Sequence, residues 1–440
     1  MRNIVMFGAG KSAYSLIKYI LDTAEENNWK LTIADMFPKQ VEEKFNKAKS
    51  LTTYEFNLEN VVLKDNLIEN SDLVISMLPA RFHQEIASSA LKFSKHLITP
   101  SYCSKEMTAL HSEVKAKGLV FLNEIGLDPG IDHMSAMELI HRIQKEGKKI
   151  TAFESFTGGL IAPESDNNPW HYKFTWNPRN VILAGAGGSV KFLHNGKHKY
   201  IPYHKLFERT EAIHIENFGE FEGIANRDSL KYIDIYGLHD VKTMYRGTLR
   251  RPPYSKAWAL LVQIGATDDS FIMEDTETMT YRQFTNSFLK YREGDSVELK
   301  LAYYVHCDVD SDAMKLLKWV GLFENKVIGL KKATPAQVLQ HLFEQKWTME
   351  SDDKDMIVMH HLFKFGEGEV LKSSMVVLGD DNNNTAMAKT VGLPIAIAAK
   401  LILNNKIKER GVLMPMQEEI YKPILEELKD YGVIFNEKLS

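Results

Sequence analysis

Residues 4–13 read IVMFGAGKSA, and this stretch decides the fold of the first part of the chain. The apolar run at 4–7 is typical of a strand buried on both faces of a parallel sheet. The next six residues have the spacing G-x-G-x-x-A, in which the first glycine permits a tight turn and the second lets a pyrophosphate approach the backbone. A helix that begins here would direct its free N–H groups at that pyrophosphate. The stretch therefore predicts a dinucleotide-binding strand–turn–helix unit.

The rest of the first 130 residues repeats this alternation of strand and helix signals. Short apolar runs occur at 31–34, 73–78, 96–98 and 119–122, and stretches with helical periodicity lie between them at 84–93 and 105–117. Repeated strand–helix units with right-handed crossovers build a doubly wound parallel sheet. The sequence therefore predicts an α/β, Rossmann-type domain over 1–130.

A different pattern follows residue 130. Runs at 151–157 (ending at a glycine pair), 299–305, 356–363 and 370–377 indicate strands of a second, mixed sheet, and helices are expected at 310–319, 335–345, 386–404 and 418–428. We expect an α+β mixed-sheet domain over 131–280 and 350–385 and a helical subdomain over 281–349. The helices of 386–440 are expected to complete the first domain.

Asp35 ends the second predicted strand, where dinucleotide-binding domains place the acid that contacts a ribose. Its carboxylate would accept hydrogen bonds from a 2′-hydroxyl and repel a 2′-phosphate, whereas Lys39 nearby would weaken that repulsion. We therefore expect NAD as the cofactor, with NADP the less favoured alternative.

Two more strand ends, at 77–78 and after 96–98, contribute candidates, because ligands of doubly wound folds bind at the carboxyl edge of the sheet. Ser101 and Tyr102 follow the strand at 96–98 and are candidates to lie near the nicotinamide. The alternative is that they cap a helix or fill a loop. The residues expected on these grounds to bind the cofactor are Gly8, Gly10, Lys11, Ser12, Ala13, Asp35, Met77, Leu78 and Ser101.

The composition excludes several classes of protein. The 440 residues are 44% hydrophobic and 25% charged with a formal net charge of -4, so nothing indicates a nucleic acid or a membrane surface as partner. No run reaches the roughly 20 apolar residues of a membrane span. Two cysteines fit a reducing compartment, and no spacing of acids or histidines favours a metal site. We expect a cytoplasmic protein without a metal.

Residues 123–134 read NEIGLDPGIDHM and follow the strand at 119–122. They place two carboxylates and an imidazole within six residues, although a Pro-Gly turn with a capping aspartate is the alternative. With later motifs in the same order, this segment resembles the glutamate-forming saccharopine dehydrogenases. The later motifs are GGL at 158–160, APE at 162–164, NNP at 167–169, YKF at 172–174, NRDS at 226–229, RGTLR at 246–250, KDMIVM at 354–359 and AMAKTVGLP at 386–394.

The resemblance implies an oxidoreductase of lysine metabolism, expected to act in degradation, that assembles as a homodimer. Saccharopine would lose a hydride from the ε-carbon of its lysine-derived half, and water would hydrolyse the imine to L-glutamate and 2-aminoadipate 6-semialdehyde. The family's residues at the junction of cofactor and substrate map onto Ser101, Tyr102, Leu127 and Asp128. Asp128 is the first candidate for proton transfer, ahead of Tyr102 and His133.

By the same resemblance, Arg227 and the segment Thr248, Leu249 and Arg250 map to saccharopine binding. Three substrate carboxylates suit arginine, which binds a carboxylate through two parallel hydrogen bonds, and the alternative for both arginines is a surface ion pair. Trp170 either lines the substrate's aliphatic chain or packs in the core. Thr157 stands where the family commonly has cysteine, which puts a thiol role there in doubt.

Two other functions stay open. The first is the reductive condensation of a diamine with an aldehyde, as in the related carboxynorspermidine synthases, whose polyamine substrate calls for an acidic site. The second is a sensor that binds NAD without turnover. The NNP and RGTLR matches favour saccharopine over a diamine, because its extra carboxylates suit arginines. Retention of Asp128, Arg227 and Arg250 argues against the sensor, which has no need of a site for three carboxylates.

Overall fold

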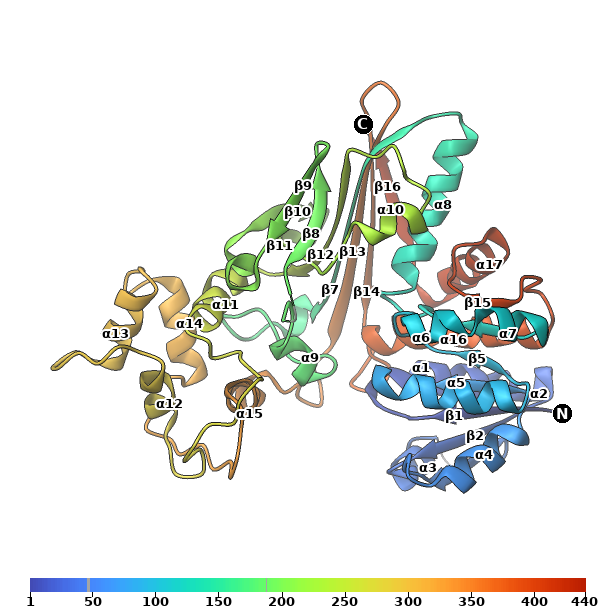
Figure 1. The fold of residues 1–440 in the computed structure, drawn as a ribbon, viewed down its shortest axis with the longest axis horizontal. Helices are drawn as coiled ribbons and strands as arrows, with labels where there is room; N and C mark the ends of the chain where they lie inside the picture. Colours follow the sequence, from blue (N-terminus) through green and yellow to red (C-terminus); the bar gives the residue numbers. More distant parts are fainter. Residues whose placement is uncertain (46–47, 187) are drawn as a thin grey trace. The chain divides into compact units, whose positions relative to one another are not determined.

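The structure is a computed structural model that describes residues 1–45, 48–186 and 188–440. The chain forms two compact units, which are described separately (Figure 1). Unit 1 comprises Met1–Lys148 and Met375–Asn436, and unit 2 comprises Lys149–Ser374 and Glu437–Ser440. Unit 1 is therefore built from the two ends of the chain, and unit 2 mainly from its middle.

Unit 1 contains a seven-stranded parallel sheet in the order β15-β6-β5-β4-β1-β2-β3. Its strands are β1 (Arg2–Phe7), β2 (Trp29–Asp35), β3 (Leu51–Glu55), β4 (Leu73–Ser76), β5 (His96–Ile98), β6 (Val120–Leu122) and β15 (Gly411–Leu413). The strand order reverses between β1 and β4, and ligands of doubly wound sheets bind at such a point. The predicted Rossmann-type sheet is confirmed.

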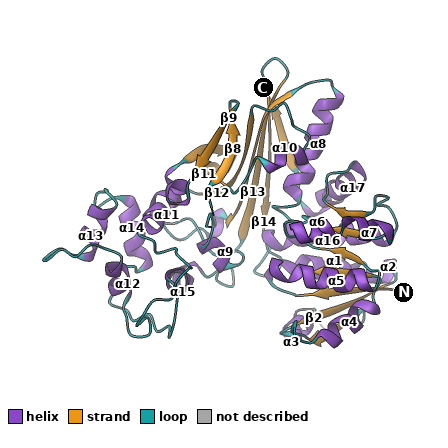
Figure 2. Cartoon of the chain, in the orientation of Figure 1, coloured by secondary structure: helices purple, strands orange, loops and turns teal. Residues whose placement is uncertain are grey.

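Helices cover both faces of this sheet (Figure 2). One face packs α4, α5, α6 and α7 in a common apolar core, and α1, α8, α16 and α17 pack among themselves and against the sheet. The helices are α1 (Tyr14–Asp22), α2 (Ala24–Asn27), α3 (Pro38–Lys44), α4 (Val61–Glu69), α5 (His83–Lys92), α6 (Lys105–Ala109), α7 (His111–Ala116), α8 (Ile131–Lys145), α16 (Ala386–Leu403) and α17 (Glu418–Leu428).

Helix α16 is long and apolar enough to cross a membrane by length and composition, but 83% of its apolar window is buried inside the structure. It lies against α1 so closely that a Cβ on Gly392 would come 2.8 Å from the backbone nitrogen of Leu16. Glycine at this position therefore permits the contact between the two helices. The apolar side chains of α16 therefore form part of the core of unit 1.

Unit 2 is organised around a mixed, nine-stranded sheet in the order β10-β11-β12-β7-β13-β14-β16, in which β8 pairs with β12 and β9 pairs with β8. Strand β7 runs through the glycine pair at 158–159, where the sequence predicted its end. A Cβ on Gly158 would lie 2.8 Å from the Cβ of Leu249, so glycine here allows close strand packing. The strands are β7 (Ile150–Ile161), β8 (Val190–His194), β9 (Lys197–Ile201), β10 (Thr210–Ile215), β11 (Gly219–Ala225), β12 (Thr243–Arg250), β13 (Asp355–Phe365), β14 (Glu369–Leu378) and β16 (Phe435–Leu439).

The expected strand at 299–305 is wrong, because this stretch lies in a helix, α13 (Val297–Tyr304). The hydroxyl of Ser296 accepts a hydrogen bond from the backbone N–H of Leu299 and so caps that helix. The other helices of unit 2 are α9 (Pro178–Ile182), α10 (Lys231–Ile235), α11 (Tyr254–Gln263), α12 (Tyr281–Ser287), α14 (Asp312–Val320) and α15 (Pro335–Trp347).

Candidate functional site

The glycine loop after β1 has the backbone geometry that its sequence requires. Gly8 has a φ of +90°, and a Cβ there would lie 3.1 Å from the carbonyl oxygen of Met77. A Cβ on Gly10 would meet no atom within 4 Å, so the space beside the loop is open. Ala13 is buried in the turn of 3₁₀ helix, η1 (Lys11–Ala13), that leads into α1. The loop thus offers the approach that a pyrophosphate needs.

Asp35 braces this loop. Its Oδ2 accepts a hydrogen bond from the backbone N–H of Ala9 over 2.7 Å, and its Oδ1 accepts one from Phe37 over 2.8 Å. Both carboxylate oxygens therefore bind backbone N–H groups. Hydrogen bonds to a carboxylate offset part of its charge, so Asp35 presents less repulsion to an anion than a free carboxylate would.

The remaining candidates of unit 1 come from three neighbouring strand ends. The backbone N–H of Met77 donates to the carbonyl of Phe7 over 2.8 Å, so the end of β4 lies beside the glycine loop. Ser101 and Tyr102 follow β5, and both are half-buried. Leu127 and Asp128 follow β6, with Leu127 buried and Asp128 half-buried.

Tyr102 and Asp128 contact each other directly. The hydroxyl of Tyr102 donates to Oδ1 of Asp128 over 3.0 Å. The loop that carries Asp128 turns sharply, with Gly130 at a φ of +148°, where a Cβ would fall 2.0 Å from the carbonyl oxygen of Gly126. Only glycine fits this turn, which holds Asp128 opposite Tyr102.

Glu124 fastens the segment that contains Tyr102, a role that sequence reasoning missed. Its backbone N–H donates to the carbonyl of Ser101 over 3.1 Å, and its Oε1 accepts a hydrogen bond from the N–H of Cys103 over 2.9 Å. Its Oε2 lies 2.8 Å from Nε2 of His133, which is fully buried. The buried pair of Glu124 and His133 therefore holds the backbone on both sides of Tyr102. Glu124 has a φ of +55°. A positive φ is uncommon for a residue other than glycine, so the sequence could not predict this conformation.

His83 is the second residue that sequence reasoning missed. It begins α5 and is 5% exposed. Its Nδ1 lies 2.8 Å from Oγ of Ser76, and its Nε2 lies 2.7 Å from Oγ of Ser101 and 2.9 Å from Oγ1 of Thr99. Burial lowers the pKa of His83 to about 4, so the ring is neutral near pH 7. A histidine shortly after a strand end was the available sequence signal.

In unit 2, Arg250 is a buried guanidinium group without a carboxylate partner among the described residues. It is 5% exposed, its Nη1 donates to the carbonyl of Leu249 over 2.8 Å, and its Nε has no hydrogen-bond partner. Its Cζ lies 4.9 Å from the ring centre of Tyr172 and 5.3 Å from that of Tyr254. An unpaired buried charge is costly, so this group is suited to receive an anion.

The other candidates of unit 2 differ in their surroundings. Thr248 pairs in register with Thr157 across β12 and β7, and Oγ1 of Thr157 is buried without a hydrogen-bond partner. Arg227 is exposed and has a φ of +50°. Trp170 is fully buried; its indole N–H donates to the carbonyl of Leu316 over 3.2 Å, and its ring packs against Trp347. Its contacts are those of a core residue.

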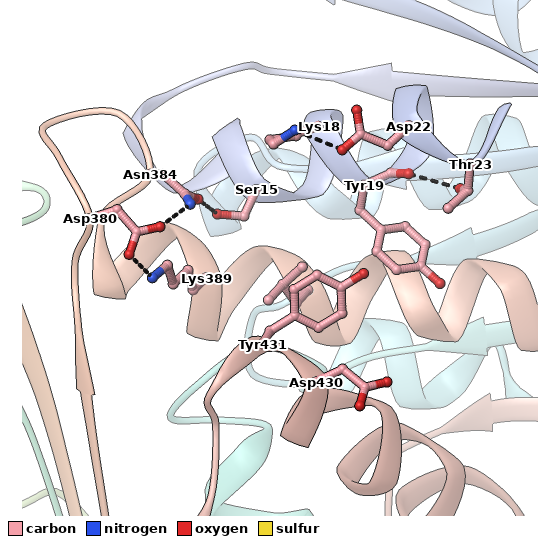
Figure 3. Close-up of a pocket in the computed structure, with 11 residues that line it drawn as sticks. Ser15, Lys18, Tyr19, Asp22, Thr23, Asp380, Asn384, Lys389, Asp430 and Tyr431 are labelled. Atoms are coloured by element: carbon pink, nitrogen blue, oxygen red, sulfur yellow. Dashed lines mark hydrogen bonds and ion pairs between the residues drawn. The ribbon is translucent and has the colours of Figure 1, made fainter.

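A separate cavity of about 270 Å³ lies in unit 1 along α1 (Figure 3). Four of its charged side chains form two ion pairs: Lys18 contacts Asp22 over 2.7 Å, and Lys389 contacts Asp380 over 2.5 Å. Ser15 donates to Asn384 across the same cavity. None of the predicted site residues lines it. No group of three or more His, Cys, Asp or Glu residues that could hold a metal occurs in the described part of the chain.

Comparison with known proteins gives two family matches. Residues 4–122 match the saccharopine dehydrogenase NADP binding domain, and residues 126–433 match the saccharopine dehydrogenase C-terminal domain. A solved structure, apo saccharopine dehydrogenase (L-Glu forming) from Saccharomyces cerevisiae, is similar with a TM-score of 0.88 and 29% identity, covering 100% of both chains.

This chain matches different shares of two relatives. The saccharopine dehydrogenase [NADP(+), L-glutamate-forming] of Schizosaccharomyces pombe is 30% identical over 100% of this chain and 99% of its own. The mitochondrial alpha-aminoadipic semialdehyde synthase of Rattus norvegicus is 32% identical over 99% of this chain and 47% of its own. The chain therefore spans about half the length of the rat protein.

The expectation of NAD as the main cofactor is wrong. The matching domain is an NADP binding domain, and relatives from three fungi carry NADP(+) in their names. We expected the carboxylate of Asp35 to bind a ribose hydroxyl and to repel a 2′-phosphate. In the structure both of its oxygens accept backbone N–H groups, from Ala9 and Phe37, and these hydrogen bonds offset part of the charge behind that expected repulsion.

Proposed function

The chain belongs to the saccharopine dehydrogenase family, and on that premise we propose that it cleaves saccharopine oxidatively to L-glutamate and 2-aminoadipate 6-semialdehyde, with NADP(+) as the cofactor. The observation that carries this proposal is the hydrogen bond between Tyr102 and Asp128 at the carboxyl edge of the cofactor-binding sheet. Bound NADP(+) would accept the hydride, and the open space beside Gly10 fits its pyrophosphate.

Proton transfer is assigned to the Tyr102–Asp128 pair. The secondary ammonium of saccharopine must lose a proton before its ε-carbon gives up a hydride, and we assign the acceptance of that proton to the carboxylate of Asp128. Water then adds to the carbon–nitrogen double bond and loses one proton to solvent. The nitrogen must gain a proton before its bond to that carbon breaks, and the remaining hydroxyl proton leaves to solvent as the aldehyde forms. Asp128 can return the proton it took, while Tyr102 keeps its carboxylate oriented.

Recognition of the substrate is assigned to unit 2. Arg250 offers a buried guanidinium with a free Nε, and pairing with a substrate carboxylate would compensate its burial. A diamine would bring no negative charge to this position, so the condensation of a polyamine precursor is the weaker alternative. A cofactor sensor would have no use for such a buried cation at all.

The test is turnover of purified protein with saccharopine and either NADP(+) or NAD(+), followed by the absorbance of the reduced nicotinamide. Glutamate and the semialdehyde are identified as products, and the reverse reaction is run with reduced cofactor to compare the two directions. Turnover with NADP(+) that Asp128→Asn abolishes supports the proposal. Cofactor binding without turnover of saccharopine would contradict it and favour a sensor.

A further inference from the structure

Every hydrogen-bonding atom of the buried His83 ring faces a hydroxyl group. Ser76 at the end of β4 lies on the Nδ1 side, and Thr99 and Ser101 after β5 lie on the Nε2 side. The ring therefore joins the carboxyl ends of two neighbouring strands beside the glycine loop. Nε2 of His83 lies 2.7 Å from Oγ of Ser101. The tautomer of His83 therefore decides whether the Ser101 hydroxyl donates to the ring or is left to donate to another group.

The two hydroxyls at Nε2 favour one tautomer. A lone pair on Nε2 could accept from only one O–H, and the second hydroxyl oxygen would face that lone pair. A hydrogen on Nε2 can be shared between Oγ of Ser101 and Oγ1 of Thr99, at 2.7 and 2.9 Å. Nδ1 then accepts from the hydroxyl of Ser76. This form satisfies all three contacts.

We propose that His83 is a positioning residue, which donates from Nε2 to Ser101 so that the Ser101 hydrogen is left to bind an acceptor oxygen of the ligand. The ligand atom is a carbonyl or carboxylate oxygen, of the cofactor's amide or of the substrate. This inference rests on the proposed function, in which Ser101 lies where cofactor and substrate meet. His83 itself need not touch either.

Two isosteric substitutions separate this role from packing. The amide of asparagine occupies the place of Nδ1, so His83→Asn keeps a partner for Ser76 and loses the bond to Ser101. The amide of glutamine occupies the place of Nε2, so His83→Gln keeps the bond to Ser101 and loses the one to Ser76. We expect H83N to lower kcat/KM about tenfold and H83Q to stay within about threefold of the wild type. Equal losses in the two variants would overturn the proposal.

A double substitution tests whether His83 acts through Ser101. In a Ser101→Ala background, H83N should change kcat/KM by less than about twofold, because the hydroxyl it orients is gone. A further tenfold loss there would show that His83 works by another route. His96→Gln is the matched control, since His96 is also a histidine of this sheet whose pKa burial lowers to about 4, but its Nδ1 binds the N–H of Val120. We expect H96Q to leave kcat/KM unchanged.

Two readouts do not depend on turnover. The ring nitrogen chemical shifts of His83 should report the Nε2–H tautomer, and the opposite tautomer would overturn the proposal. The affinity for reduced NADP or for saccharopine, measured by titration, should fall in H83N and not in H83Q. If the wild type binds cofactor but never turns over saccharopine, the proposed function fails, and these two measurements still decide the role of His83.

Discussion

The hydroxyl of Tyr102 donates to Oδ1 of Asp128 over 3.0 Å, although the two residues are 26 positions apart and follow different strands. Parallel strands bring their carboxyl ends to the same edge of a sheet, so the fold creates this pair. Its chemistry is that of a carboxylate held in a fixed orientation by a phenol.

Substitution of Asp128 should therefore remove most of the activity. We expect Asp128→Asn to lower kcat about 100-fold or more, because the amide cannot accept the substrate proton. Tyr102→Phe should lower it less, since the carboxylate remains and only its orientation is lost. The pH dependence of kcat/KM checks this: the acidic limb should disappear in D128N and persist in Y102F. A D128N variant with wild-type rates would exclude Asp128 from proton transfer.

Arg250 should affect substrate binding more than folding. We expect Arg250→Met to raise the KM for saccharopine at least ~10-fold, because a carboxylate loses its bidentate partner. Stability should hold or increase, since the variant removes a buried cation that has no carboxylate partner in the described structure. Arg251→Lys is the neighbouring control, because Arg251 instead binds the carbonyl of Phe218. Large destabilisation of R250M with unchanged KM would contradict this role.

The two glycines of the cofactor loop should respond differently to alanine. Gly8→Ala places a Cβ 3.1 Å from Met77 at a φ of +90°, so we expect loss of stability together with loss of cofactor binding. Gly10→Ala meets no protein atom within 4 Å, so its melting temperature should match the wild type while its affinity for NADP(+) falls. Thermal unfolding and cofactor titration measure both. Unchanged cofactor affinity in G10A would mean that the pyrophosphate does not pass there.

Acid should destabilise the protein through its buried histidines. Burial lowers the pKa values of His83, His96 and His360 from 6.5 to about 4. Between these values the unfolded chain binds protons that the folded chain does not, so stability is lost as the pH falls from about 6.5 towards 4. One imidazole contributes on the order of 2–3 kcal/mol across that window. Urea unfolding at about pH 7 and about pH 5 should show a smaller difference in His360→Gln than in the wild type.

Local patterns were enough to predict the first sheet and its cofactor loop. The apolar run at 4–7 and the glycine spacing after it specify a buried strand and a turn without reference to the rest of the chain. The prediction of a strand at 299–305 was wrong because a short apolar segment suits a strand or a buried helix equally. The cap at Ser296, three residues before Leu299, was the signal that separates the two.

The partners of the site could not be predicted in the same way. His83 binds residues seven positions before it and up to 18 positions after it, and Glu124 holds Cys103 from 21 positions away. No periodicity encodes such contacts, which arise only when strand ends meet. The burial of Arg250 without a carboxylate is likewise a property of packing. The homodimer, the cytoplasmic location and the domain boundaries expected from the sequence stay predictions.

The close contact of Gly392 with Leu16 has a consequence for folding during synthesis on the ribosome. Helix α1 is made before residues 149–374, whereas α16, which packs against it, is made after them. Until then the apolar surface that α16 covers has no partner within the chain. Most of unit 2 (149–374) is therefore made while residues 1–148 of unit 1 still lack α16, and the apolar surface they expose is of the kind that chaperones bind. Both units are completed only when the segment 375–440 has been made.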